Sequence, residues 1–192
     1  PRRARDTGIG PYACDGCYEP FEPRGDEAPE TNLPMARAWM PAVGAMLVVD
    51  SPRTLFDYTE MMRSTALDRV IAHVMGERPA LLTSKCTLRR VAPGATIPDW
   101  HQDGSFLRRT GLLNMWVALS EAGRDAPGLQ LLPRRLTSIV RTGTEGASAG
   151  WTVAPRIVDE LAREAPLWVP AFRPGDALFF DDLCLHRVWS AP

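Results

Sequence analysis

The chain has 192 residues, of which 45% are hydrophobic and 23% are charged. That length fits one domain with a single hydrophobic core, and the composition has too little charge for an intrinsically disordered chain. The 22 Lys and Arg residues balance 23 Asp and Glu residues to a net charge of −1, so the summed field favours neither nucleic acid nor an anionic membrane as a partner. No apolar run approaches the roughly 18 residues that span a bilayer.

The four cysteines are too few and too unevenly spaced for a disulfide framework. A reducing compartment, the cytoplasm, is therefore expected. Cys14 and Cys17 form a Cys-x-x-Cys pair, but no second pair supplies the other ligands that tetrahedral zinc requires. We interpret this pair as incidental loop cysteines.

Residues 1–45 are rich in proline, glycine and charge and show no sustained period of 2 or 3.6. This pattern predicts an irregular N-terminal arm, which we interpret as a possible lid over a site. From Ser51 the pattern becomes helical, because Ser51 has the character of an N-cap and Pro52 suits the first helical position.

A second helix is expected after Thr65, which has capping-box spacing with Asp68, and it should end at Gly76. His73 lies off the apolar face of this helix and is interpreted as a solvated surface histidine. The expected apolar face comprises Leu67, Val70, Ile71 and Val74.

After Pro79 the pattern changes to short apolar runs broken by Gly, Pro and Asp, which is typical of β-strands. A predicted helix over Pro155–Glu164 interrupts them. Short strands preceded by helices indicate a mainly β fold, a β-sandwich or barrel with an N-terminal helical buttress, over residues 46–192 of a single 1–192 domain. The expected strands cover residues 80–91, 111–119, 128–132, 137–141, 166–172, 176–181 and 183–189.

A candidate metal site begins at His101 and Asp103, because residues i and i+2 of an extended strand share a face. His186, at the far end of the sequence, is the one other plausible ligand. Two histidines and one carboxylate form the facial triad of non-haem Fe(II) oxygenases. Zinc hydrolases use similar ligands, but the His-Glu-x-x-His run that typically supplies them is absent from the sequence.

At these motifs the sequence resembles the phytanoyl-CoA dioxygenase-like branch of the Fe(II)/2-oxoglutarate oxygenases. The similarity covers about residues 46–192, and its three separate motifs occur in the family's order. They are Trp100-His101-Gln102-Asp103, the stretch from Asn114-Met115-Trp116 to Leu132-Pro133, and Pro174-Gly175-Asp176 leading to His186.

The resemblance implies a double-stranded β-helix (a jelly roll, cupin-like) with Fe(II) held by His101, Asp103 and His186. It implies 2-oxoglutarate and O2 as cosubstrates and hydroxylation, or another oxidation, of an unactivated C–H bond in a small-molecule substrate. A carboxylate at Asp103, where related halogenases have Gly or Ala, disfavours chlorination. In the same family Trp116 would line the cosubstrate pocket, with Asn114 on the same face, although a core role for Trp116 stays open.

Arg90 is the candidate for an inward-facing cosubstrate contact, with a solvated surface arginine as the alternative. Family members also place an arginine about ten residues beyond the distal histidine to grip the far carboxylate of 2-oxoglutarate. This sequence stops six residues after His186, so we expect the C-terminal end to be truncated. Two alternatives stay open: a jelly-roll binding module or pseudoenzyme that has lost cosubstrate binding, and a zinc-dependent hydrolase. No pattern predicts the oligomeric state.

Overall fold

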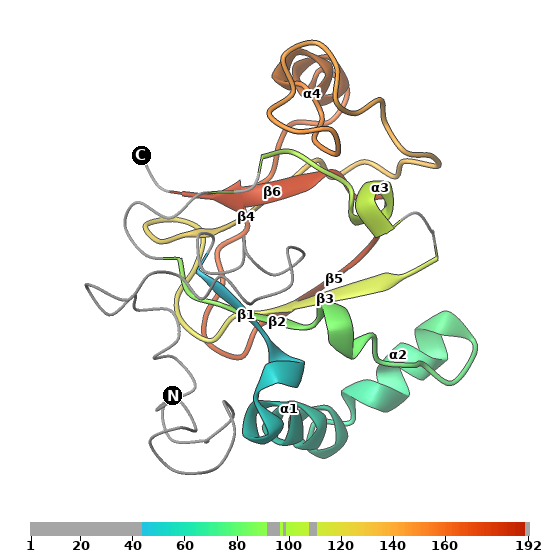
Figure 1. Ribbon diagram of the computed structural model, residues 1–192, viewed down its shortest axis with the longest axis vertical. Coiled ribbons are helices and arrows are strands. Elements are labelled where there is room, and N and C mark those ends of the chain that lie inside the picture. The colour runs from blue at the N-terminus through green and yellow to red at the C-terminus, as the bar shows by residue number, and fades with distance from the viewer. Residues whose placement is uncertain (1–43, 92–96, 98, 108–110, 191–192) are drawn as a thin grey trace, which may run out of the picture. The chain divides into compact units, whose positions relative to one another are not determined.

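A computed structural model describes residues 44–91, 97, 99–107 and 111–190 of the chain. It divides into two compact units, Pro1–Thr96 and Ile97–Pro192 (Figure 1). The N-terminal arm, with Cys14 and Cys17, lies outside the described residues. None of the helices in the described part has the length and hydropathy needed to cross a membrane.

The first unit pairs two short strands and carries two helices. β1 and β2 are antiparallel, with Met46 opposite Leu88. The elements are β1 (Ala45–Leu47), a 3₁₀ turn (Val48–Asp50), α1 (Pro52–Ser64), α2 (Leu67–Met75), a second 3₁₀ turn (Thr83–Lys85) and β2 (Thr87–Arg89).

Helix α1 begins as predicted. Ser51 is its N-cap, and the Ser51 hydroxyl accepts a hydrogen bond from the amide of Thr54 at 3.3 Å, with Pro52 in the first turn. The serine satisfies one of the amides that a helix start leaves without a partner.

The predicted capping box of α2 is wrong. Its N-cap is Ala66, in the left-handed region with φ 59°, and no side chain caps it. Thr65 belongs instead to the end of α1, where its hydroxyl donates to the carbonyl of Met61 at 2.6 Å. The helix does end at Gly76, which adopts φ 71° as expected of a C-cap glycine.

The apolar face predicted for α2 is only partly buried. Ile71 is buried, whereas Val70 and Val74 are 51% and 68% exposed. His73 is exposed, as predicted.

The second unit contains two antiparallel ladders that form two layers (Figure 1). One ladder pairs β3 with β5 along their full lengths, and the other pairs β4 with β6. The elements are α3 (Asp103–Leu107), β3 (Leu113–Val117), β4 (Gly128–Leu131), α4 (Pro155–Ala162), β5 (Ala177–Asp181) and β6 (His186–Trp189).

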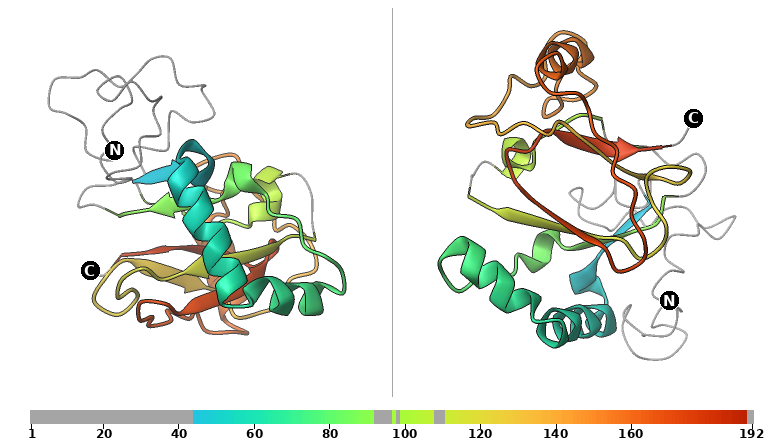
Figure 2. Two further views of the ribbon diagram at one scale, coloured as in Figure 1. Left: turned by 90° about the horizontal axis from the view of Figure 1, so that it is seen from below. Right: turned by 180° about the vertical axis from the view of Figure 1, so that it is seen from behind.

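Figure 2 shows the ladders of this unit from two further directions. Single bridges add to both ladders. His101 pairs with His186 at the start of β6 and with Thr152 on its other side. Antiparallel strands with flanking helices are thus present as predicted. Leu131 of β4 pairs with Trp168 on the edge away from β6, and Ala122 with Phe172 continues the register of the β3–β5 ladder.

Two clusters of side chains form the core of the second unit. The larger packs beneath the segment that carries His101 and includes Val158 of α4. The smaller comprises Ala118, Ala122 and Phe172, with Trp116 and Leu178 packed against it. The buried members of the larger cluster are Trp100, Leu132, Val153, Val158 and Leu185.

Each predicted strand is shorter than expected or missing, and three of them differ most from the prediction. Residues 80–91 yield only β2 and a 3₁₀ turn, and residues 166–172 make only isolated bridges, because Pro166 and Pro170 cannot donate to a ladder. Residues 137–141 form no strand. There the side chain of Gln102 occupies the backbone groups that a neighbouring strand would pair.

Candidate metal centre

The two buried histidines of the second unit lie directly opposite each other. The amide of His101 donates to the carbonyl of His186 at 2.9 Å, and the amide of His186 donates back at 3.0 Å. Residues that exchange both bonds are directly opposed, and their side chains lie on the same face of the sheet. The ring centroids are consequently 4.4 Å apart.

Asp103 joins the pair from the first turn of α3, not from the extended strand that the sequence predicted. Its carboxylate still faces both rings. Oδ1 lies 3.6 Å from Nε2 of His101 and 4.0 Å from Nε2 of His186. One ligand atom from each residue lies within 4.8 Å of the others, which is close enough for one metal ion to contact all three.

Backbone carbonyls orient both imidazole rings. Nδ1 of His101 lies 2.6 Å from the carbonyl of Asp99, and Nδ1 of His186 lies 3.0 Å from that of Cys184. Because a carbonyl only accepts, Nδ1 carries the proton in each ring, and Nε2 carries the lone pair that a metal ligand needs. Two imidazole nitrogens and a carboxylate oxygen are donors that suit Fe(II), so the residues fit the predicted metal.

The thiol of Cys184 lies in the segment that leads to His186. Burial, together with the carboxylates of Asp181 and Asp103, raises the pKa of Cys184 to about 12. In the metal-free protein this thiol therefore stays protonated at neutral pH.

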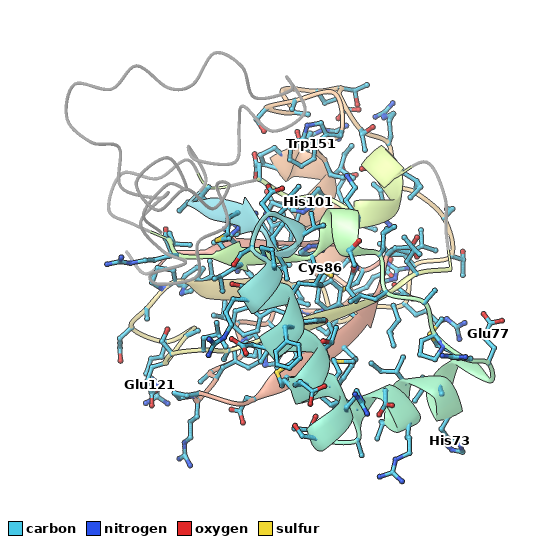
Figure 3. All side chains as sticks on the ribbon, turned by 60° about the horizontal axis from the view of Figure 1, so that its bottom comes forward. His73, Glu77, Cys86, His101, Glu121 and Trp151 are labelled. Atoms are coloured by element: carbon cyan, nitrogen blue, oxygen red, sulfur yellow. The ribbon has the colours of Figure 1, made fainter. Side chains whose placement is uncertain are left out.

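Aromatic rings flank the two histidines. Trp151 packs edge-on against His101 with ring centroids 5.2 Å apart, and Phe180 lies 4.9 Å from the ring of His186. Figure 3 shows Trp151 beside His101. Trp151 is 36% exposed, so it stands where the centre meets solvent.

Asn114 and Trp116 of β3 lie on the same face of the ladder as Phe180, whose ring contacts His186. Asn114 lies opposite Phe180 in the ladder, and Trp116 lies opposite Leu178. The Nδ2 atom of Asn114 is buried and makes no hydrogen bond within the described part of the chain. The ring centroid of Trp116 also lies 4.5 Å from that of Phe172, a member of the smaller core cluster. Cosubstrate contacts for both residues stay predictions.

Arg90 belongs to the first unit and its side chain is exposed there. Cys86 and Leu88, which alternate with Arg90 along the same face of the segment, are half-buried, whereas Arg90 is exposed. Its predicted role with 2-oxoglutarate stays a prediction. Arg187, next to the distal histidine, points to other partners: it donates to Gln130 at 2.8 Å and lies 4.9 Å above the ring of Trp100.

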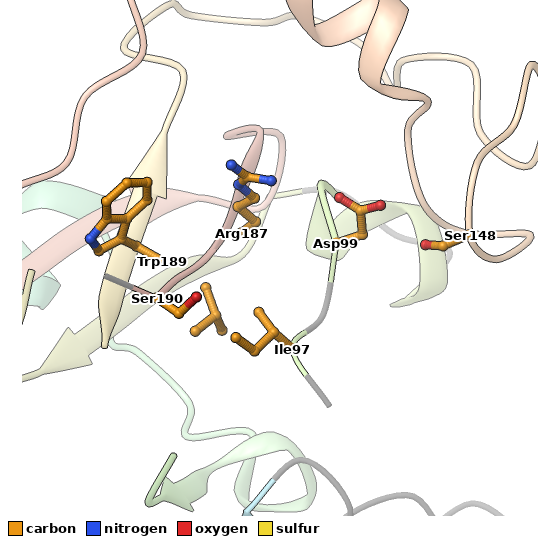
Figure 4. A pocket seen from close by; sticks show the side chains of 7 residues that line it. Ile97, Asp99, Ser148, Arg187, Trp189 and Ser190 are labelled. Carbon is orange, nitrogen blue, oxygen red and sulfur yellow. The ribbon is translucent and has the colours of Figure 1, made fainter. Parts of the chain in front are cut away.

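A pocket of about 350 Å³ opens beside β6 (Figure 4). None of the three predicted metal ligands lines it, but Asp99, whose carbonyl orients His101, does. We therefore place the chemistry at the histidines and not in this pocket. Its lining residues are Ile97, Asp99, Ser148, Arg187, Val188, Trp189 and Ser190.

Sequence reasoning missed three residues around the centre: Gln102, Trp151 and Phe180. Gln102 stands between two predicted ligands, which was the one available signal. Trp151 and Phe180 carry no local signal, because their approach to the histidines depends on how distant segments fold together.

The sequence and the structure were compared with known protein families and solved structures. A family model described as phytanoyl-CoA dioxygenase (PhyH) matches residues 25–188. Among solved structures, EctD from S. alaskensis, crystallised with 2-oxoglutarate and 5-hydroxyectoine, is similar at 19% identity and a TM-score of 0.37. The match covers 49% of this chain and spans a third of that protein's length, 33%. No curated protein matches the chain.

Proposed function

The chain belongs to the phytanoyl-CoA dioxygenase family, and on that premise we propose that it hydroxylates, or otherwise oxidises, an unactivated C–H bond of a small-molecule substrate. Its cofactor and cosubstrate are Fe(II) and 2-oxoglutarate. When held by this centre, Fe(II) would activate O2, and conversion of 2-oxoglutarate to succinate and CO2 would supply the two electrons that substrate hydroxylation does not.

His101, Asp103 and His186 hold the metal in this proposal. The observation that carries it is the convergence of two Nε2 atoms and one carboxylate oxygen within 4.8 Å, with both rings oriented by backbone carbonyls. Preset ring orientations reduce the entropy that ligands lose on binding. The carboxylate of Asp103 offsets part of the positive charge that the metal brings.

Asn114 and Trp116 line the cosubstrate and substrate side of the centre. The buried Nδ2 of Asn114 offers a donor to a carboxylate or carbonyl oxygen. Trp116 supplies an apolar wall beside it. Arg90 is retained as a further cosubstrate contact.

We infer that the two ladders of the second unit are the two sheets of a double-stranded β-helix. The family match extends across parts of both units, which supports treating residues 1–192 as one oxygenase domain. Among the described residues Cys86 and Cys184 are free thiols, in keeping with the cytoplasmic location we propose.

An anaerobic titration with Fe(II) and 2-oxoglutarate tests the function. We expect a weak visible charge-transfer band from the chelated cosubstrate in the unaltered protein, and its loss in His101→Ala. His73→Ala, which removes an exposed histidine outside the centre, should keep the band. Iron binding without the band would favour the pseudoenzyme, and activity with zinc in the absence of O2 would favour the hydrolase.

A further inference from the structure

Gln102 is fully buried between the ligands His101 and Asp103, with 0% of its surface exposed. A buried amide must satisfy its own polar atoms or destabilise the fold. Its Nε2 donates to the carbonyls of Leu183 at 2.6 Å and Ser138 at 3.2 Å, and its Oε1 accepts from the amide of Val140 at 2.7 Å. One side chain thus joins three segments.

These partners permit only one orientation of the amide. The opposite orientation would place Oε1 against two carbonyl oxygens and Nε2 against the amide of Val140. A substitution that removes the donor takes a hydrogen bond from the carbonyls of Leu183 and Ser138. The loss costs more at the half-buried Leu183, because water is available to replace the partner at the exposed Ser138.

The residue on the other side of Asp103 is tied to the same turn. The amide of Gly104 donates to the carbonyl of Asp182 at 2.9 Å, and Gln102 bonds to Leu183, the next residue along. The following residue, Cys184, offers the carbonyl that orients His186. The turn between β5 and β6 therefore contacts the neighbours of Asp103 and the ring of His186.

We propose that Gln102 is a positioning residue: its buried amide fixes the segment carrying His101 and Asp103 to the turn that leads to His186, and so sets the metal affinity of the centre. Gln102 does not contact the metal itself. The inference rests on the proposed metal centre, so its test first establishes that the unaltered protein binds metal.

Co(II) titration, followed by visible absorption, measures the affinity without turnover. Gln102→Met keeps the volume and removes every polar bond; Gln102→Glu keeps the acceptor for Val140 and sets an oxygen against two carbonyls. We expect both to bind Co(II) about tenfold or more weakly, with an altered ligand-field spectrum, because loss of outer-shell partners typically costs 10–100-fold.

The control is Val158→Ala, which weakens the core cluster under the site but breaks none of these hydrogen bonds. It should lower the melting temperature and keep the Co(II) affinity within about twofold. If the Gln102 variants match the unaltered protein in affinity and spectrum, the inference is wrong while the metal centre stands. If the unaltered protein binds no Co(II), the proposed function fails with it.

A second measurement, NMR of the glutamine side-chain amides, uses the unaltered protein and needs one variant only to assign the two signals. The chain has two glutamines, Gln102 and Gln130, so [¹⁵N]glutamine labelling gives two side-chain amides in an NMR spectrum. In the metal-free protein we expect the Gln102 amide protons to exchange slowly with solvent, and the signal to shift when Zn(II) binds. Fast exchange at Gln102, or no response to Zn(II), would overturn the inference even if the variants fail to fold.

Discussion

Three histidines in one chain occupy two different environments. His101 and His186 are buried, opposed and oriented through Nδ1, whereas His73 is exposed on α2. The first two therefore belong to the proposed metal centre, and His73 does not. Single substitutions should therefore show which of the histidines the stabilisation by bound metal depends on.

We expect a divalent metal to stabilise the unaltered protein and not His186→Ala or Asp103→Ala. A ligand that binds only the folded state at about 100 times its Kd adds about 2.7 kcal/mol to the free energy of unfolding. Thermal unfolding with and without Mn(II) measures this effect. His73→Ala should keep the full shift in melting temperature; an equal shift in Asp103→Ala would remove that carboxylate from the centre.

The convergence of His101, Asp103 and His186 was predictable from the sequence, whereas the contacts of Gln102, between two of them, were not. His101 and Asp103 are neighbours along the chain, so their convergence needs only local geometry. The partners of Gln102 lie 36, 38 and 81 positions away. No periodicity or turn pattern in a single sequence encodes contacts at those separations. The local backbone was also predicted wrongly, because Asp103 was expected in an extended strand and lies in helix α3.

At the scale of elements, helix starts differ in what stabilises them. Ser51 caps α1 through its side chain, whereas Thr65 bonds backward to Met61 and caps nothing in α2. We expect Ser51→Ala to lower the free energy of unfolding by about 1 kcal/mol, and Thr65→Ala to lower it by less than about 0.5 kcal/mol. Urea unfolding followed by circular dichroism compares the two variants. A larger loss of unfolding free energy in Thr65→Ala than in Ser51→Ala would support the capping box after all.

That pair also shows why the first boundary was predictable and the second was not. Serine followed by proline leaves few alternatives to a helix start. The Thr65–Asp68 spacing fits a capping box equally well. However, the two-residue connection places Ala66 in the left-handed region, and Thr65 already serves as the C-cap of α1.

Helix α3 packs against the turn between β5 and β6 with almost no room to spare. A Cβ added at Gly104 would lie 2.9 Å from Cδ1 of Ile139 and 3.3 Å from two oxygens of Asp182. The end of Ile139 is able to move, but the buried Asp182 is not. Overpacking costs about 1–3 kcal/mol, and the better helix propensity of alanine offsets up to about 1 kcal/mol.

Gly104→Ala should therefore destabilise the protein by about 1 kcal/mol and weaken Mn(II) binding, because Asp103 is the adjacent residue. Gly150→Ala is the matched control, since no atom lies within 4 Å of its added Cβ, and it should leave both quantities nearly unchanged. Unfolding in urea and Mn(II) binding, followed by electron paramagnetic resonance, measure them. A Gly104→Ala protein as stable as Gly150→Ala would mean that the turn adjusts freely.

For the whole molecule, we expect stability at high pH to depend on partly buried acids in both units. Burial, and secondarily the neighbouring Cys86, raises the pKa of Tyr58 from 10.0 to about 12. The pKa of Cys184 rises from 9.0 to about 12, and burial also raises the pKa of Cys86. Each group keeps its proton in the folded protein at a pH where the unfolded chain has lost it.

The sign of the effect follows from the protons bound. Between about pH 9 and 12 the folded state binds more protons than the unfolded state, so the free energy of unfolding falls as pH rises. The contribution is fully present below pH 9 and is lost as pH passes the folded pKa values near 12. Tyr58→Phe removes the ionisable group in the first unit, and Cys184→Ala removes one in the second.

We expect the urea midpoint of the metal-free protein to fall steeply from pH 9 to pH 12, and less steeply in each variant. Tyr58 is only partly buried, so solvent screening makes its share smaller than the shift alone implies. His73→Ala, which removes no raised acid, should follow the unaltered protein. Identical slopes in all four proteins would mean that these groups titrate alike in the folded and unfolded states, and that the alkaline limit of the fold arises elsewhere.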